Sequence, residues 1–255
     1  HYPLRRQRQM CIRDRASRLM TDRREVTCRR WRATFLVLAS LASLTWAFAG
    51  VLNPAMSQLH AFVSEYSARD QPWRYLFQTT DVIMGTLLCL AGLATLVWAR
   101  HRPLGRQGWS GVGFVAGGFF SVLDALVTMD CSPTRSQACM AAEEAGHVSV
   151  NHVVHVGTST IVVVGFALPI LLLNSTMTRF RGFGLVVTWA WVVFTLLNGI
   201  GAVGWFVGTP MDYTGIWQRF SLGLGTLWWL ILAADDIVTA RVQDRALLLS
   251  SLTRS

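Results

Sequence analysis

Six apolar stretches recur along the 255-residue chain, separated by shorter polar segments. Each stretch is about 20 residues long, enough to cross the roughly 30 Å hydrocarbon core of a bilayer as a helix rising about 1.5 Å per residue. We therefore predict an all-α fold, a polytopic membrane bundle of six transmembrane helices with short loops. The predicted spans cover approximately residues 33–52, 76–99, 109–129, 152–173, 184–207 and 215–234.

Arginine and the acidic residues alternate between successive polar segments. The segments before the first span and after the second, fourth and sixth spans are rich in arginine, and the other connections carry most carboxylates. Because short cytoplasmic loops are enriched in basic residues, we predict a bacterial cytoplasmic (inner) membrane protein with both termini in the cytoplasm. The decisive arginines are Arg23, Arg24, Arg29, Arg30, Arg32, Arg100, Arg102, Arg106, Arg179, Arg181, Arg241 and Arg245, and the outer acids are Glu65, Asp70, Asp130, Glu143, Glu144 and Asp212.

Composition favours a membrane protein over a nucleic-acid-binding one. Hydrophobic residues make up 52% of the chain and charged residues 15%. The formal net charge is +9, but the basic residues occur in short clusters between apolar stretches and do not form one continuous basic segment. The predicted surroundings are therefore a lipid bilayer, with a lipid or a membrane protein as the expected kind of partner and no nucleic acid.

The beginning of the chain is interpreted separately from the spans. Residues 5–15 match one reading frame of a transposon-type sequencing adapter. We therefore interpret residues 1–19 as an adapter-derived artefact and a disordered arginine-rich arm. Met20 is then the expected start, and residues 20–255 form a single six-helix transmembrane domain.

The first span has an alternative interpretation. An arginine-rich start, an apolar run and the Ala-Phe-Ala sequence at residues 47–49 together resemble a cleaved signal peptide. The apolar run continues to Leu52 and is long enough to cross a bilayer, which favours a retained transmembrane helix.

Ionisable side chains inside the predicted spans are the main indication of a functional site, because such groups are costly in a bilayer. Five of them are predicted at a similar depth near the outer interface, which indicates one shared polar site. They are Asp81 in the second span, Asp124 in the third, His152 and His155 at the start of the fourth, and Arg219 in the sixth.

His152, His155 and Ser159 fall on one face of the fourth predicted helix, at positions i, i+3 and i+7. Two imidazoles at this spacing can bind one metal ion or relay a proton. A carboxylate from Asp124 or Asp81 would complete a zinc site of the hydrolytic type, which keeps one position for water. The alternative is a hydrogen-bonded polar cap without a metal. The candidate catalytic residues are His152, His155, Ser159 and Asp124, and the candidate metal ligands are His152, His155, Asp124 and Asp81.

Other polar and small residues have structural interpretations. Arg219 is expected to form a structural ion pair with Glu65, Asp81 or Asp124, in preference to a catalytic role. Asp81 has the alternative role of capping the start of its helix. In the third span, Gly113 and Gly117 indicate close helix packing, and Asn198 in the fifth is a further candidate polar contact.

The two longest outer connections carry predictions of their own. In residues 53–75 the apolar positions recur at helical spacing, which predicts a short interfacial helix. Cys131 and Cys139 share the other connection, where a turn at Ser132-Pro133 would let them form a disulfide in an oxidising compartment. Free thiols are the alternative.

Several short motifs resemble those of a bacterial family catalogued as domain of unknown function 998. The resemblance covers the chain after about residue 31 and implies a six-span membrane protein, in agreement with the apolar pattern. No activity is implied, because none is established for the family. The motifs are Ser64-Glu65-Tyr66-Ser67-Ala68, Pro72-Trp73, Phe77, Met129-Asp130-Cys131-Ser132-Pro133, Cys139, His152-x-x-His155 and Gly215-x-Trp217-Gln218-Arg219.

Three functions fit these residues. The preferred hypothesis is a binding or accessory membrane protein in which the buried charges stabilise helix packing. The second is a metal-assisted hydrolase or transferase acting on a lipid or lipid-linked substrate at the outer leaflet, similar in kind to ceramidase-like and adiponectin-receptor-like hydrolases. The third is a small proton-coupled transporter, which is disfavoured because no inverted repeat and no charge at mid-membrane depth is evident.

Overall fold

The computed structural model shows a chain that is helical over most of its length, and it describes residues 2–100, 105–206 and 213–252. Within these residues, six helices are long and apolar enough to cross a membrane, which confirms the predicted all-α, six-span architecture. The chain is thus a multi-pass membrane protein. Arg102 and Asp212, which contributed to the predicted orientation, lie outside the described residues.

The first span consists of three consecutive helical segments, and the other spans are single long helices. α1 (Tyr2–Ser43) continues through the 3-10 helix η1 (Leu44–Phe48) into α2 (Ala49–Leu52). Two short helices, η2 (Val63–Ser67) and α5 (Gln137–Glu144), lie in connecting segments. The remaining elements are α3 (Arg74–Ala99), α4 (Arg106–Leu126), α6 (Val150–Leu173), the 3-10 helix η3 (Asn174–Thr176), α7 (Arg181–Phe206) and α8 (Thr214–Leu252).

Three boundaries differ from the predicted ones. α1 begins at Tyr2, so residues 2–19 are helical where a disordered arm was expected, consistent with the high helix propensity of arginine. α8 continues to Leu252, past the predicted end of the sixth span, and Asp236, Gln243 and Asp244 of this extension contact α1. The short interfacial helix predicted within residues 53–75 corresponds to the 3-10 helix η2, which spans only Val63–Ser67.

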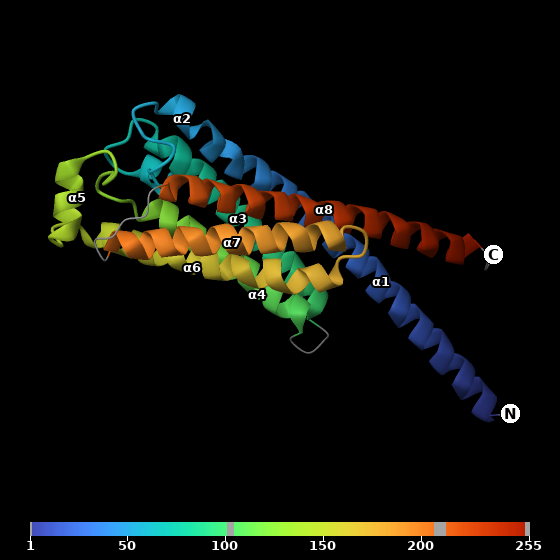
Figure 1. Cartoon of the computed structure of the whole chain (residues 1–255). Coiled ribbons are helices and arrows are strands. Elements are labelled where there is room, and N and C mark those ends of the chain that lie inside the picture. Colours follow the sequence, from blue (N-terminus) through green and yellow to red (C-terminus); the bar gives the residue numbers. More distant parts are fainter. Residues whose placement is uncertain (1, 101–104, 207–212, 253–255) are drawn as a thin grey trace.

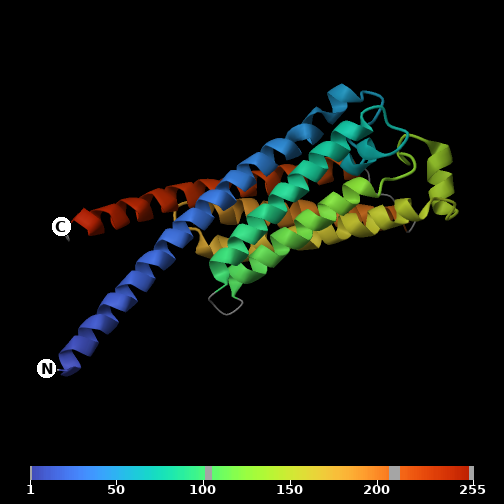
Figure 2. The same cartoon turned by 180° about the vertical axis from the view of Figure 1, so that it is seen from behind.

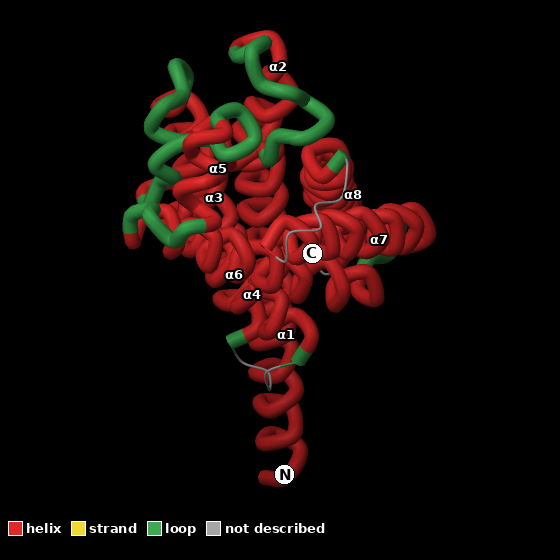
Figure 3. Tube along the Cα trace, turned by 60° about the vertical axis from the view of Figure 1, so that its left-hand side comes forward, coloured by secondary structure: helices red, strands yellow, loops and turns green. Residues whose placement is uncertain are grey.

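The two ends of the bundle differ in character. Both termini lie at one end, and α2 and α5 lie at the opposite end (Figures 1 and 2). At that opposite end the connection from α2 to α3 and the connection from α4 to α6 come together. We call these residues, 53–73 and 127–149, the cap. Figure 3 shows its loops gathered around α2 and α5, opposite the start of α1.

The transmembrane helices pack side by side in the order α6, α4, α3, α1, α8, α7. α6 and α7 are the first and last helices of this row. They are joined by η3 at the end of the bundle where both termini lie. There Asn174 donates a hydrogen bond to Thr188 of α7 and accepts one from the indole N–H of Trp228. Elsewhere α6 and α7 make little direct contact, so the row does not close into a complete ring.

Glycines bring α4 close to both of its neighbours, as the spacing of Gly113 and Gly117 predicts. A methyl group built on Gly113 would lie 2.7 Å from the carbonyl oxygen of Gly165 in α6. One built on Gly118 would lie 2.5 Å from the carbonyl oxygen of Gly85 in α3. The helix backbones therefore touch, which places α4 firmly between the two helices that carry the other polar residues.

A buried ion cluster joins α1 to α8 near the end that carries the termini. Arg32 donates two hydrogen bonds to Asp236 at 2.6 and 2.7 Å, and Arg29 donates one at 2.9 Å. Both guanidinium groups lie over the ring of Trp98, at 4.5 and 5.3 Å. The sixth span was predicted to end at about residue 234, so this cluster was not anticipated. The counter-charge of the buried Asp236 thus comes from two arginines of α1.

Candidate functional site

Glu65 joins the two halves of the cap. Its carboxylate accepts hydrogen bonds from the Phe62 N–H at 2.8 Å, the Thr134 N–H at 3.1 Å, and the hydroxyls of Ser132 and Thr134. The side chain is fully buried. This burial raises the pKa of Glu65 above its ordinary value, and the hydrogen bonds oppose the rise. Glu65 therefore has a structural role, linking residues 53–73 to residues 127–149.

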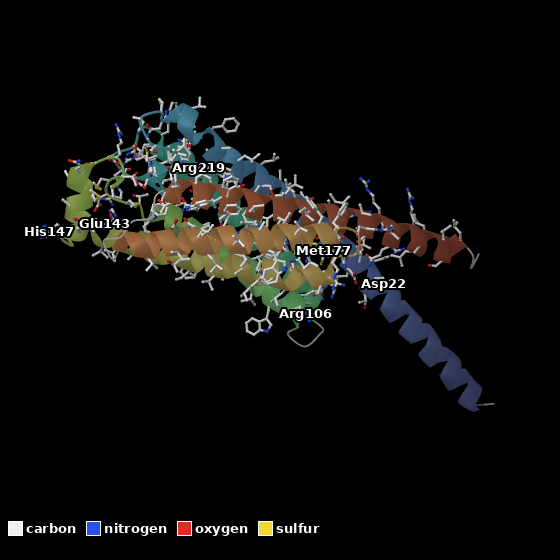
Figure 4. All side chains as sticks on the ribbon, in the orientation of Figure 1. Asp22, Arg106, Glu143, His147, Met177 and Arg219 are labelled. Carbon is white, nitrogen blue, oxygen red and sulfur yellow. A yellow bond between two sulfur atoms is a disulfide. The ribbon has the colours of Figure 1, made fainter. Side chains whose placement is uncertain are left out.

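Arg219 also holds the cap. The ion pair predicted with Glu65, Asp81 or Asp124 is not among the salt bridges of the described residues. Nη1 of Arg219 instead donates to the carbonyl oxygen of Ala61 at 2.9 Å, and Nη2 donates to the Tyr66 hydroxyl at 3.3 Å. The guanidinium also lies 5.7 Å from the centre of the Tyr66 ring. Arg219, labelled in Figure 4, thus fastens α8 to the cap.

His152 connects the start of α6 to the cap. Its Nδ1 accepts a hydrogen bond from the Asp130 N–H at 3.3 Å, and its Nε2 lies 3.8 Å from a carboxylate oxygen of Glu143. Asp130 in turn accepts hydrogen bonds from the N–H and the hydroxyl of Ser149, the N-cap residue of α6. Partial burial raises the pKa of Asp130. The hydrogen bonds from Ser149 and the positive charge of Arg69 together lower this pKa by more, so it lies below its ordinary value.

A disulfide between Cys131 and Cys139 attaches α5 to the rest of the cap, with their Cα atoms 6.0 Å apart. The N-terminus of α5 is capped by Ser136, whose hydroxyl accepts a hydrogen bond from the Cys139 N–H at 3.2 Å. Figure 4 shows Glu143 and His147 at this end of the molecule, farthest from the termini. The disulfide therefore holds α5 across the end of the bundle.

His155 makes contacts different from those of His152, although the two were predicted to act together. Its Nδ1 lies 3.0 and 2.9 Å from the carbonyl oxygens of Asp124 and Val127, and 3.4 Å from the Asp124 carboxylate. Because all three neighbours are acceptors, the neutral ring carries its proton on Nδ1. Nε2 is then an acceptor, and it is buried without a hydrogen-bond partner among the described residues.

Asp124 lies beside His155, and a second carboxyl group, Asp81, lies near Asp124. Asp124 of α4 accepts hydrogen bonds from the hydroxyls of Thr158 and Ser159 in α6, the second at 2.9 Å. Asp81 of α3 is close enough to Asp124 for two negative charges to repel each other. Within the described part of the chain, Asp81 has no hydrogen bond. One carboxyl group is thus held by α6, and the other is left without a partner.

An outer cavity of about 400 Å³ lies between α6 and α7 beneath the cap. Its polar lining includes His155 and Asn198, and the side-chain oxygen of Asn198, like Nε2 of His155, is buried without a partner in the described structure. Its apolar lining includes Val164 and Val203, which are 61% and 62% exposed on the surface of the bundle. The cavity therefore opens sideways, on the surface that faces lipid.

An inner cavity of about 180 Å³ lies in the centre of the bundle, and all six spans contribute to its lining. Asp81 and Asp124 both line it. Four residues, Ser64, Ser159, Val163 and Gln218, line both the inner and the outer cavity. The two cavities are therefore adjacent, and Asp81 and Asp124 line the inner one.

The candidate catalytic and metal-binding residues do not assemble as predicted. Among the described residues, no three His, Cys, Asp or Glu side chains lie close enough together to hold one metal ion. His152 accepts a hydrogen bond from the cap through Nδ1. Of the two histidines, His155 lines a cavity and His152 does not. The Ser159 hydroxyl donates to Asp124, so it is not paired with an imidazole base. What the site offers is a group of hydrogen-bond acceptors beside an apolar opening.

Some residues of the site were not anticipated. Thr158 carries no distinctive signal, because single threonine residues are common near the ends of spans. Gln218 was noted only as part of a family motif. Asn198 was noted as a candidate polar contact, since a carboxamide in an apolar span is costly unless it has a partner, and it lines the outer cavity.

A comparison with known families gives one match. Residues 36–235 match the family described as protein of unknown function (DUF998), and this range includes every residue that lines the two cavities. No curated protein and no solved structure matches the chain. The match extends over well more than half of the sequence and agrees with the motif resemblance. The chain belongs to the DUF998 family of proteins of unknown function.

Proposed function

We propose that this protein binds an amphipathic, lipid-like molecule that enters the outer cavity from the bilayer between α6 and α7. The observation that carries the proposal is the lateral opening of the cavity. Val164 and Val203 line the cavity and are also exposed on the bundle surface. A molecule diffusing in the membrane can therefore reach the cavity without crossing water.

The volume and lining of the cavity suit such a ligand. Cavities of roughly 300–1,000 Å³ with mostly apolar walls and a few polar groups are typical ligand-binding sites. Here the volume is about 400 Å³, and the apolar walls include Val156, Val163 and Ala202. An alkyl tail fits against these walls, and the polar head of the ligand lies toward the cap.

The polar end of the cavity calls for a ligand with hydrogen-bond donors. Nε2 of His155 and the side-chain oxygen of Asn198 are acceptors with no partner in the described residues. A buried acceptor without a partner costs about 1–3 kcal/mol. A ligand head that carries hydroxyl or amine groups would satisfy both atoms, which supports a binding role.

The hydrolytic alternative is less well supported by the geometry. A serine nucleophile needs a base within hydrogen-bond reach, and here Ser159 faces the carboxylate of Asp124. Nδ1 of His155 is also directed at Asp124 and at backbone carbonyls, so Asp124 lies between the two groups. This arrangement fixes α6 against α4 and leaves Ser159 without an imidazole base.

The proposal is tested by photolabelling of the full chain in lipid nanodiscs with hexadecanol that carries a diazirine on its chain. We expect saturable labelling of α6 and α7, mapped by mass spectrometry to the cavity walls. Ala202→Trp fills the cavity and should abolish the saturable labelling. Ile200→Trp, on the same helix but lipid-facing and outside the cavity lining, should leave it unchanged. Labelling that never saturates and ignores Ala202→Trp would disprove the proposal.

A further inference from the structure

The inner cavity is lined by two carboxyl groups whose oxygens have few hydrogen-bond partners among the described side chains. Asp124 has one oxygen engaged by Thr158, Ser159 and the nearby His155, and no hydrogen bond to its other oxygen is formed by described residues. Asp81 has none to either oxygen. A buried or membrane-embedded carboxylate needs a counter-charge or hydrogen-bond donors, because its desolvation is otherwise too costly.

No arginine supplies that charge in the described structure. Arg219 donates its hydrogen bonds to the carbonyl oxygen of Ala61 and to the Tyr66 hydroxyl. Arg29 and Arg32 bind Asp236 near the opposite end of the bundle. Even a fully protonated His155 would balance only one of the two carboxylates.

An ammonium group matches the vacant acceptors better than a metal ion does. A primary ammonium presents three N–H donors and one positive charge. Asp81, the second oxygen of Asp124 and Nε2 of His155 are acceptors without partners among the described side chains. A site for a metal ion would need more ligands than gather here, since no cluster of three His, Cys, Asp or Glu is present in the described residues.

The position of the carboxyl groups links them to the outer cavity. Ser64, Ser159 and Gln218 line both cavities, so a ligand whose tail lies between α6 and α7 can extend its head toward Asp81 and Asp124. The hydroxyl of Ser121 also lines the inner cavity and adds a further polar atom there.

We infer that the ligand of the outer cavity is a long-chain primary amine, whose ammonium head is bound in the inner cavity by Asp81 and Asp124. This inference rests on the proposed function and narrows its ligand class from amphipathic molecules to cationic ones. Asp81 supplies the main charge contact, because it has no other partner. Asp124 is the second contact and is positioned by Thr158 and Ser159.

The test compares two photoreactive probes on the full chain in nanodiscs at neutral pH, diazirine-tagged hexadecylamine and diazirine-tagged hexadecanol. The amine should reach half-maximal labelling at a concentration about tenfold lower or less, because a desolvated ion pair adds to its affinity. Asp81→Asn keeps the size of the side chain and should remove this preference while labelling by the alcohol remains. Glu144→Gln, an exposed carboxyl on α5, controls for surface charge and should leave the preference intact.

The number of N–H donors is tested separately. Unlabelled hexadecylamine should displace the amine probe more effectively than hexadecyltrimethylammonium, which carries the same charge without a donor. Equal labelling by amine and alcohol, unaffected by Asp81→Asn, would overturn the ammonium inference and leave the proposed function standing. If neither probe labels saturably, both proposals fail.

Discussion

Asp130 shows how one side chain connects the cap to a membrane-spanning helix. Its carboxylate accepts two hydrogen bonds from Ser149 at 2.6 and 2.7 Å, while its own N–H donates to His152 one turn further along. Arg69, from the other half of the cap, lies 3.3 Å away. The charge of Asp130 therefore stabilises the first turn of α6, which contains His152 and precedes the turn that contains His155.

This arrangement predicts a pH-dependent stability. Because the folded pKa of Asp130 is lowered, the folded chain binds fewer protons than the unfolded one at acidic pH. The contribution of Asp130 to the free energy of unfolding is complete above the pKa of the unfolded state, about 4. This contribution is lost as the pH falls through the pKa of the folded state. Asp130→Asn should lower unfolding stability by about 1–2 kcal/mol near neutral pH and flatten this acid dependence.

The measurement is thermal unfolding of detergent-purified protein across acidic pH. Glu144→Gln removes an exposed carboxyl nearby and should behave as the parent does. An acid profile of Asp130→Asn that superimposes on that of the parent would show that Asp130 has no such role.

Helix packing around α4 depends on backbone contacts that tolerate no side chain. A Cβ on Gly165 would lie 2.6 Å from the backbone nitrogen of Gly117, and a Cβ on Gly113 would lie 2.7 Å from the carbonyl oxygen of Gly165. Main-chain atoms cannot move aside as a flexible side chain can. The position of α6 relative to α4, and so of His155 relative to Asp124, depends on these glycines.

We predict that Gly165→Leu destabilises the protein by at least about 3 kcal/mol, the upper end of ordinary overpacking. Gly157 lies on the same helix, and a Cβ added to it would have no neighbouring atom within 4 Å, so Gly157→Leu should be tolerated. Denaturant unfolding in detergent and the yield of folded protein measure both. Equal stability of the two variants would contradict the packing argument.

At the scale of the whole molecule, the row of helices is open between α6 and α7 and is covered at one end by the cap. The ion cluster of Arg32 and Asp236 holds the opposite end, where both termini lie. A cap stabilised by a disulfide belongs in an oxidising compartment. Together with the arginine distribution, this supports our proposal that the cap faces outward from a bacterial inner membrane and the termini face the cytoplasm.

Cysteine labelling tests this orientation. His147 is exposed on the cap, and Arg241 is exposed near the termini. In intact spheroplasts, an impermeant maleimide should label His147→Cys, and it should label Arg241→Cys only after the membrane is permeabilised. The reverse pattern would place the cap in the cytoplasm.

The number and approximate position of the spans could be predicted from the sequence alone, because membrane crossing depends on the length of a local apolar run. The family assignment also followed from local motifs. Cys131 and Cys139 could be paired for a similar reason, since they are only eight residues apart and the chain between them can turn back.

Which polar side chains are in contact depends on the tertiary structure. At roughly 100° per residue, the side chains of His152 and His155 point in directions about 60° apart around α6. This difference is enough for His152 to contact the cap and for His155 to line the outer cavity. Their partners Asp130 and Asp124 are 22 and 31 residues away in the chain. Asp236 finds Arg32 across 204 residues. Such contacts depend on how whole helices pack against one another, and no local sequence pattern encodes that packing. The lateral opening between α6 and α7 depends on the same packing.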